Sequence, residues 1–211
     1  MIIVSLTTIP TRFDNLNITI DSILNQTILP DKIIIHIPEK YNNYEYNKNN
    51  LPKFSSDKVI INNNVKDYGP ATILLGLYDF YIFNNMKDED IIIIIDDDRI
   101  YNNNLIKNML YYHKLFIDKV LTIAGWDIEI ISKNYIIENK KQPRGIEYNT
   151  PGYSDFLAGC CGFLLNKKMC PFNNIEIFDL SPDVPYYYVD DIWISGFLTL
   201  NNIDIYMVPN S

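Results

Sequence analysis

Five consecutive isoleucines, residues 91–95, run directly into Asp96, Asp97 and Asp98. An uninterrupted β-branched run is typical of a strand buried on both faces, as in a parallel α/β sheet. Ligands of such sheets bind beyond the carboxyl ends of the strands, which is where the three acids would lie. Adjacent carboxylates repel one another, so three of them at one strand end suggest that a positive charge binds there. A divalent cation is one candidate for that charge. A solvated turn in which an Asp caps the next helix is the other, and the three acids alone do not choose between the two.

Strand-like and helix-like segments alternate along the chain in the order that builds a mainly parallel sheet. We expect one α/β domain over residues 1–211, Rossmann-like, with helices flanking a mixed but mainly parallel sheet. The predicted strands are 2–6, 32–37, 59–61, 91–95, 120–124, 156–165 and 204–208. The predicted helices are 14–26, 70–85, 102–116 and 192–200. Two segments lack a sustained period: 39–57 predicts a long surface excursion, and 132–154 predicts an active-site loop or hairpin.

Charge and hydropathy exclude several classes of protein. The chain has 211 residues and a net charge of −8, with no block of basic residues, so we expect no binding to nucleic acid. No run approaches the roughly 18 apolar residues of a membrane span. The apolar start is broken by Thr7, Thr8 and Pro10, so we expect no signal peptide and a cytoplasmic protein. The richness in Ile, Asn, Lys and Tyr suggests that an AT-rich genome encodes the protein. If that genome is viral, we expect the protein in the cytoplasm of the host cell.

The cysteines and histidines do not predict a zinc site. Cys160, Cys161 and Cys170 lack CxxC spacing, and both histidines lie far from them in sequence, so we expect buried reduced thiols. His36 is interpreted as a buried strand residue and His113 as a surface or packing residue of a helix. No GxSxG, Walker A, GxGxxG or HExxH motif occurs, which leaves serine hydrolases, P-loop proteins and Rossmann dehydrogenases without support.

Two acidic groups could carry chemistry. Mg²⁺ and Mn²⁺ sites combine one or two carboxylates with water and substrate phosphate oxygens. On an extended chain Asp96 and Asp98 point to the same side, so we predict these two as the cation and nucleotide contacts and Asp97 as structural. Asp190 and Asp191 precede the last predicted helix, where they could cap it or serve as a general base. At a helix start the dipole is expected to keep their pKa values low.

Five segments occur in one order along the chain. They are SLTTIPTR (5–12), DYGPAT (67–72), DDDRIY (96–101), FLAG (156–159) with Gly162, and VDDIWIS (189–195). Together they resemble a small GT-A glycosyltransferase of the family-2-like, DxD-containing type, and the resemblance spans nearly the whole chain.

The resemblance implies a role for each segment. The loop after the first strand would hold the base and ribose, and the DxD-type acids would hold the ribose and, through Mn²⁺ or Mg²⁺, the diphosphate. The expected donor contacts are Thr7, Ile9, Arg12, Asp67, Gly69, Pro70, Asp96, Asp97, Ala158 and Gly159. Asp98 and Asp96 are the expected metal ligands. Asp191, together with Asp190, is the expected catalytic base.

The implied activity is transfer of a sugar from a nucleoside diphosphate sugar, first of all a UDP-sugar, to an acceptor hydroxyl. Inversion is expected because a base can be named but no nucleophile. The acceptor could be a glycan, a protein or a small molecule, held by residues 132–154, by a second copy of the chain or by a partner subunit. Two departures weaken the match: Ile73 stands where a Lys often follows the DYGPAT-type segment, and no His follows His113 as a late metal ligand.

Two alternatives stay open. A nucleotidyltransferase or metal phosphohydrolase also needs acids after a strand to hold a cation on phosphate. A catalytically idle module that binds nucleotide sugars would fit Ile73 and the absent late His.

Overall fold

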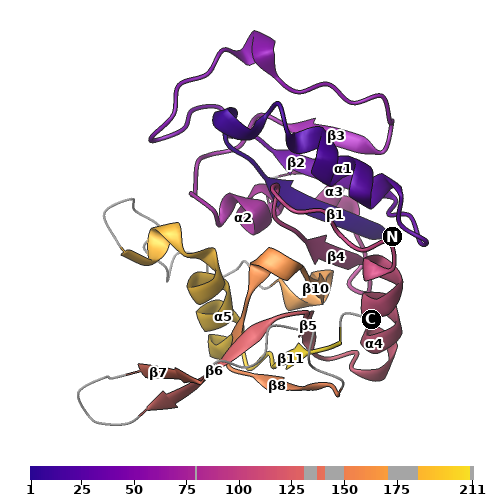
Figure 1. The fold of residues 1–211 in the computed structure, drawn as a ribbon, viewed down its shortest axis with the longest axis vertical. Coiled ribbons are helices and arrows are strands. Elements are labelled where there is room, and N and C mark those ends of the chain that lie inside the picture. The colour runs from indigo at the N-terminus through magenta and orange to yellow at the C-terminus, as the bar shows by residue number, and fades with distance from the viewer. Residues whose placement is uncertain (79, 131–136, 141–149, 171–184, 210–211) are drawn as a thin grey trace.

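A central eight-stranded sheet organises the chain in the computed structural model, which describes residues 1–78, 80–130, 137–140, 150–170 and 185–209 (Figure 1). Its strands, in spatial order, are β3 (Val59–Asn62), β2 (Lys32–His36), β1 (Ile2–Thr7), β4 (Ile91–Ile94), β10 (Phe163–Asn166), β5 (Val120–Thr122), β11 (Ile205–Met207) and β8 (Gly152–Ser154). A second, three-stranded antiparallel sheet contains β7 (Ile137–Lys140), β6 (Gly125–Ile130) and β9 (Phe156–Leu157).

The sheet is mixed but mainly parallel. Strands β3, β2, β1 and β4 run parallel to one another, as do β5 and β11, whereas β10 is antiparallel to both of its neighbours. In this register Ile94, at the end of β4, lies opposite Phe163, at the start of β10. The residues that follow β4 and those that precede β10 therefore meet at one edge of the sheet, so the expected α/β fold with a mainly parallel sheet is confirmed.

Helices cover both faces of the sheet (Figure 1). The α-helices are α1 (Leu16–Leu24), α2 (Thr72–Tyr78), α3 (Tyr81–Asn85), α4 (Leu105–Leu115) and α5 (Asp190–Leu200). Short 3₁₀ turns are η1 (Pro10–Arg12), η2 (Lys48–Asn50), η3 (Gly159–Cys161), η4 (Lys167–Met169) and η6 (Pro185–Tyr188). None of the helices in the described ranges is long and apolar enough to cross a membrane.

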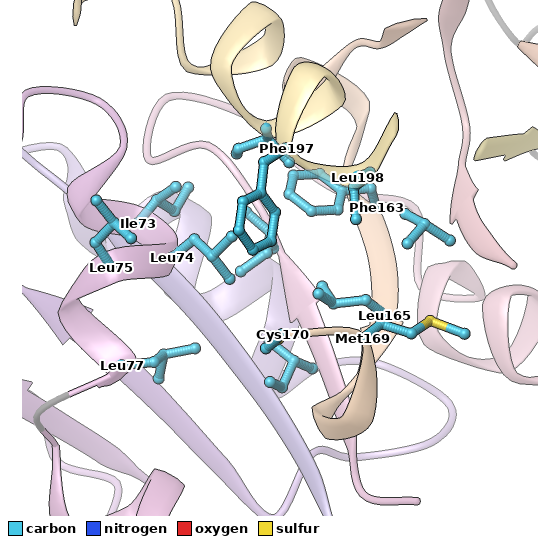
Figure 2. Close-up of a cluster of buried hydrophobic side chains, with 14 of the residues drawn as sticks. Ile73, Leu74, Leu75, Leu77, Phe163, Leu165, Met169, Cys170, Phe197 and Leu198 are labelled. Carbon is cyan, nitrogen blue, oxygen red and sulfur yellow. The ribbon is translucent and has the colours of Figure 1, made fainter. Parts of the chain in front are cut away.

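Alternation along the strands divides the core into two layers. Ile92 and Ile94 pack with α2, α3 and α5, whereas Ile91 and Ile93 pack with α1 and α4. Figure 2 shows the first layer, where apolar side chains of α2 and α5 meet those of β10. Because both faces of β4 are covered, every residue of that strand must be apolar, which explains the isoleucine run.

Two predicted elements are divided in the structure. The helix expected over 70–85 breaks into α2 and α3, because Phe80 adopts an extended conformation and packs against the core. The strand expected over 156–165 breaks at η3, and Gly162 has a φ of 90°, which favours glycine. Both predictions of one continuous element were wrong. Most of the loop expected over 132–154 lies outside the described residues.

A buried polar network ties β1, β2, β3 and α2 together. The amide of Asn62 lies 3.1 Å from His36 Nδ1, and His36 Nε2 lies 3.0 Å from the Ser5 hydroxyl, which donates to the Ile73 carbonyl at 2.6 Å. Burial lowers the pKa of His36 to about 3, so the ring is neutral. The interpretation of His36 as a buried strand residue is confirmed. His113 is buried too and belongs to the packing of α4 rather than to the surface.

Candidate active site

A pocket of about 390 Å³ opens at the edge where β1, β2 and β4 end. Ten of the residues expected from the sequence line it: Thr7, Ile9, Arg12, Asp67, Gly69, Pro70, Asp96, Asp97, Asp98 and Asp190. Their sequence positions span most of the chain, so only the fold brings them together. Ala158, Gly159 and Asp191 do not line this pocket; they lie beside it, between β9, η3 and the start of α5.

The three acids after β4 have different surroundings. Arg12 Nη1 lies 2.6 Å from Asp97 Oδ1, and Arg12 Nη2 lies 3.4 Å from Asp98 Oδ2. The Asp97 side chain is 5% exposed and that of Asp98 is 49% exposed. Thr19 donates to the backbone carbonyl of Asp97 at 2.8 Å. Asp97 is thus anchored to η1 and α1, whereas Asp98 remains open to solvent.

None of these acids caps the next helix, since α4 begins at Leu105 with Asn104 at its N-cap position. The backbone N–H of Asp96 donates to the Tyr101 hydroxyl at 2.8 Å, which folds the chain back after the acids. The capping explanation of the three acids therefore does not describe this protein.

Asp96 interacts electrostatically with the late acidic pair as well as with Arg12. Burial raises the pKa of Asp96 to about 6, and the negative charges of Asp190, Asp98 and Asp97 add to this shift. Burial likewise raises the pKa of Asp190 to about 6, with a contribution from Asp191. Removing water from several neighbouring carboxylates disfavours the ionised forms, and a bound cation would reverse this effect.

Asp191 holds a neighbouring turn in place. Its Oδ1 accepts a hydrogen bond from the Gly159 N–H at 2.7 Å, and one turn later the Ser195 hydroxyl accepts from the Leu157 N–H at 3.2 Å. These two side chains are four residues apart and so share one face of α5. A Cβ on Gly159 would lie 2.9 Å from Asp191 Oδ1, so a glycine is needed for this approach. The segment VDDIWIS therefore directs Asp190 toward the pocket and Asp191 toward η3.

The pKa expectation for this pair was wrong. Burial raises the pKa of Asp191 to about 6, although the hydrogen bond from Gly159 opposes the shift. The N-cap residue of α5, Val189, makes no side-chain capping hydrogen bond, and backbone hydrogen bonds from Asp190 and Asp191 to the Asp190 carboxylate oppose its shift. Loss of water outweighs the helix dipole here, because both carboxylates are crowded into the space beside Asp96.

Asp67 joins three segments that form another wall of the pocket. Its carboxylate accepts from the backbone N–H groups of Asn42, at 2.7 Å, and Gly69, at 2.9 Å. The Asn42 amide donates to the Tyr187 hydroxyl at 2.9 Å. Gly69 has a φ of 61°, and a Cβ there would lie 2.8 Å from the Tyr187 ring. Asp67 thus fixes the pocket wall through backbone groups while it lines the pocket.

Sequence reasoning missed part of the lining. These residues are Thr8, Pro38, Tyr41, Asn43, Tyr44, Tyr187 and Tyr188; Ile73, which the resemblance marked only as the position of a missing Lys, lines the pocket too. The tyrosines come from the 39–57 excursion and from η6, and Tyr41 is buried with its hydroxyl donating to the Thr8 carbonyl at 2.7 Å. The high Tyr content of the excursion was the available signal, but the general richness of the chain in Tyr concealed it.

The donor set fits a hard divalent cation that would share its coordination with a ligand. Among the residues that the structure describes, no group of three or more His, Cys, Asp and Glu side chains is arranged so that it could hold a metal ion by itself. The buried Asp97 Oδ2 has no hydrogen-bond partner among the described residues. That oxygen belongs to the acid that Arg12 already pairs with, so the crowded carboxylates of Asp96 and Asp98 are the ones that suit a cation whose other ligands are phosphate oxygens and water.

Comparison with known proteins identifies the fold. No protein-family model matches the chain. No curated protein matches it either. The crystal structure of Francisella tularensis 2-C-methyl-D-erythritol 4-phosphate cytidylyltransferase (IspD) is similar, with a TM-score of 0.53 and 15% sequence identity over 100% of this chain and 89% of that chain. At this identity the likeness shows the fold alone: an α/β domain with a mostly parallel sheet flanked by helices.

Proposed function

We propose that the protein is a cation-dependent glycosyltransferase that uses a nucleoside diphosphate sugar. The observation that carries the proposal is the convergence on one pocket of the loop after β1, the 67–70 turn, the acids after β4 and Asp190. This edge of a mainly parallel sheet is where α/β folds bind nucleotides. The GT-A-like fold is compatible with the proposal but does not distinguish it from other nucleotide chemistry.

Asp98 and Asp96 are the residues that would hold Mn²⁺ or Mg²⁺ together with the donor diphosphate. When bound, the cation would stabilise the negative charge that develops on the departing nucleoside diphosphate. Arg12 adds a positive charge to the lining of the same pocket. The Lys that such glycosyltransferases often have after the DYGPAT-type segment is replaced here by Ile73, which carries no charge. A UDP-sugar is the first donor to test.

The late acidic pair would take the proton from the acceptor hydroxyl. Without a bound cation, burial raises the pKa values of Asp190 and Asp191 to about 6, so both are still ionised at neutral pH and are stronger bases than an ordinary carboxylate. We expect inversion at the anomeric carbon. The acceptor, a glycan, protein or small molecule, would approach past Ala158 and Gly159, and a second copy of the chain or a partner subunit could complete its site.

A nucleotidyltransferase is the second candidate, because the fold that resembles the cytidylyltransferase suits it as well as it suits a glycosyltransferase. The two reactions release different products. A glycosyltransferase releases a nucleoside diphosphate from a nucleotide sugar, whereas a nucleotidyltransferase releases pyrophosphate from a nucleoside triphosphate.

Binding is tested first, by measuring the melting temperature with UDP, UDP-sugars and nucleoside triphosphates, with and without Mn²⁺. A ligand that binds only the native state raises the melting temperature, and a 100-fold excess over Kd stabilises by about 2.7 kcal/mol. We expect Asp98→Asn to abolish the Mn²⁺-dependent part of the shift. Asp118→Asn is the matched control, because Asp118 is an exposed acid that pairs with Lys168.

Product release is tested next, with purified protein, Mn²⁺ and each class of donor. UDP release that Asp191→Asn or Asp190→Asn suppresses, while UDP binding persists, would support the proposal. Pyrophosphate release from a triphosphate would replace it with the second candidate. Binding without turnover of any donor would indicate the idle module.

A further inference from the structure

Two adjacent thiols lie in the wall beside the late acidic pair. Cys160 and Cys161 occupy the last two positions of η3, with 3.7 Å between their Sγ atoms. Both are partly exposed, whereas Cys170 is buried elsewhere in the core. A contact between two accessible thiols that belong to neighbouring residues is the arrangement from which a vicinal disulfide forms. The function proposed above gives these thiols no role.

The same turn supplies the contact that holds Asp191. Gly159, the first residue of η3, donates its N–H to Asp191, and its carbonyl accepts from the Gly162 N–H at 2.8 Å. Cys160 lies close enough to Asp96 and Asp191 for their charges to interact. Any change in the backbone of η3 is therefore transmitted to Asp191.

Closing a bond between these two sulfurs would change that backbone. A disulfide brings its sulfurs to about 2.0 Å and usually joins Cα atoms about 4.4–6.8 Å apart. Consecutive Cα atoms across a trans peptide are only about 3.8 Å apart, so a bond between neighbours strains the chain and is easily reduced again. Gly159 and Gly162, on either side of the pair, have no side chains to resist the rearrangement.

We propose that Cys160 and Cys161 form a thiol modification site, in which a small peroxide reversibly makes a vicinal disulfide that detaches Gly159 from Asp191. Each thiol loses its proton and together they lose two electrons. Hydrogen peroxide accepts both electrons and both protons and leaves as two molecules of water. A dithiol reductant reverses the step by taking the disulfide form itself. The consequence for cation and nucleotide binding rests on the proposed function, but the modification itself does not.

The bond is tested on the full-length chain after removal of reductant. Protein treated with hydrogen peroxide is blocked with iodoacetamide, digested and analysed by mass spectrometry. We expect wild type and Cys170→Ser to lose two alkylatable thiols within one peptide and to regain them with dithiothreitol. Cys160→Ser and Cys161→Ser should form no intramolecular disulfide. If the wild-type chain forms no bond between residues 160 and 161, the proposal is wrong.

Amide hydrogen exchange tests the coupling without reference to activity. We expect the peptide that contains the Gly159 amide to exchange about 10-fold or more faster in the oxidised protein, because this amide no longer donates to the Asp191 carboxylate. Unchanged protection at Gly159 in a fully oxidised sample would overturn the link to Asp191. Mn²⁺-dependent UDP binding, measured on the same samples, should weaken on oxidation and recover on reduction. If reduced protein binds no UDP, the proposed function fails, and the mass and exchange results still decide the modification site.

Discussion

Replacing Asp190 with Asn should make the cation-free protein more stable at neutral and alkaline pH. The folded pKa of Asp190 is about 6, against 3.8 for an ordinary Asp, because burial and the charge of Asp191 disfavour ionisation. The folded chain therefore binds this proton more tightly than the unfolded chain does. The stability from this group is fully present below about pH 4 and is lost as the pH rises through about 6. An Asn is neutral throughout and does not incur that loss.

The size of the effect follows from the pKa difference. A shift of about two units corresponds to about 3 kcal/mol, at about 1.4 kcal/mol per unit. Water that enters through the open pocket will lower this figure, so we expect Asp190→Asn to gain about 2 kcal/mol at pH 8 relative to wild type. Near pH 4 the two proteins should differ little, because the wild-type carboxyl is then protonated.

The measurement is urea unfolding followed by circular dichroism at pH 4.5 and pH 8, in EDTA. Asp118→Asn serves as the control and should stay within about 0.5 kcal/mol of wild type at both pH values, since its carboxylate is exposed. A less stable Asp190→Asn protein at pH 8, or a difference that does not change with pH, would refute the account of crowded, desolvated carboxylates.

Three substitutions test the walls of the pocket, each by its free energy of unfolding. Gly69→Ala should cost about 1–3 kcal/mol because of its positive φ and its contact with the Tyr187 ring; an unaffected stability would show that the turn relaxes freely. Tyr187→Phe should cost about 1 kcal/mol through the lost hydrogen bond, whereas the exposed Tyr188→Phe should cost little; equal effects would contradict the role given to Tyr187. Arg12→Gln should cost about 1–2 kcal/mol because it leaves the buried Asp97 carboxylate without its ion-pair partner. The loss should be smaller than for breaking a fully buried ion pair, because water reaches the Arg12 guanidinium. A stabilised variant would contradict this pairing.

Prediction succeeded where the signal was local. The run 91–95 and the strands 2–6 and 32–37 are apolar enough to require burial, and the structure places strands there. The residues predicted as donor contacts in the loop after β1 and in the 67–70 turn line one pocket, and their role as donor contacts stays a prediction. Each of these segments follows or precedes a core element, so its place at the sheet edge follows from the order of strands and helices.

Prediction failed where a residue's partner is far away in the sequence. The backbone break at Phe80 depends on packing against the core, and η3 forms where Gly159 meets Asp191. The pocket tyrosines were missed because Tyr41 and Tyr187 are held by long-range hydrogen bonds that no periodicity reports.

The sequence alone determined a doubly covered strand that ends in three acids, because β-branched runs and side-chain periodicity are properties of neighbouring residues. It did not determine how those acids differ. Only the tertiary structure paired Asp97 with Arg12, left Asp98 in solvent and brought Asp96 beside Asp190. Those differences arise from desolvation and from charges contributed by distant segments, which exist only once the chain has folded.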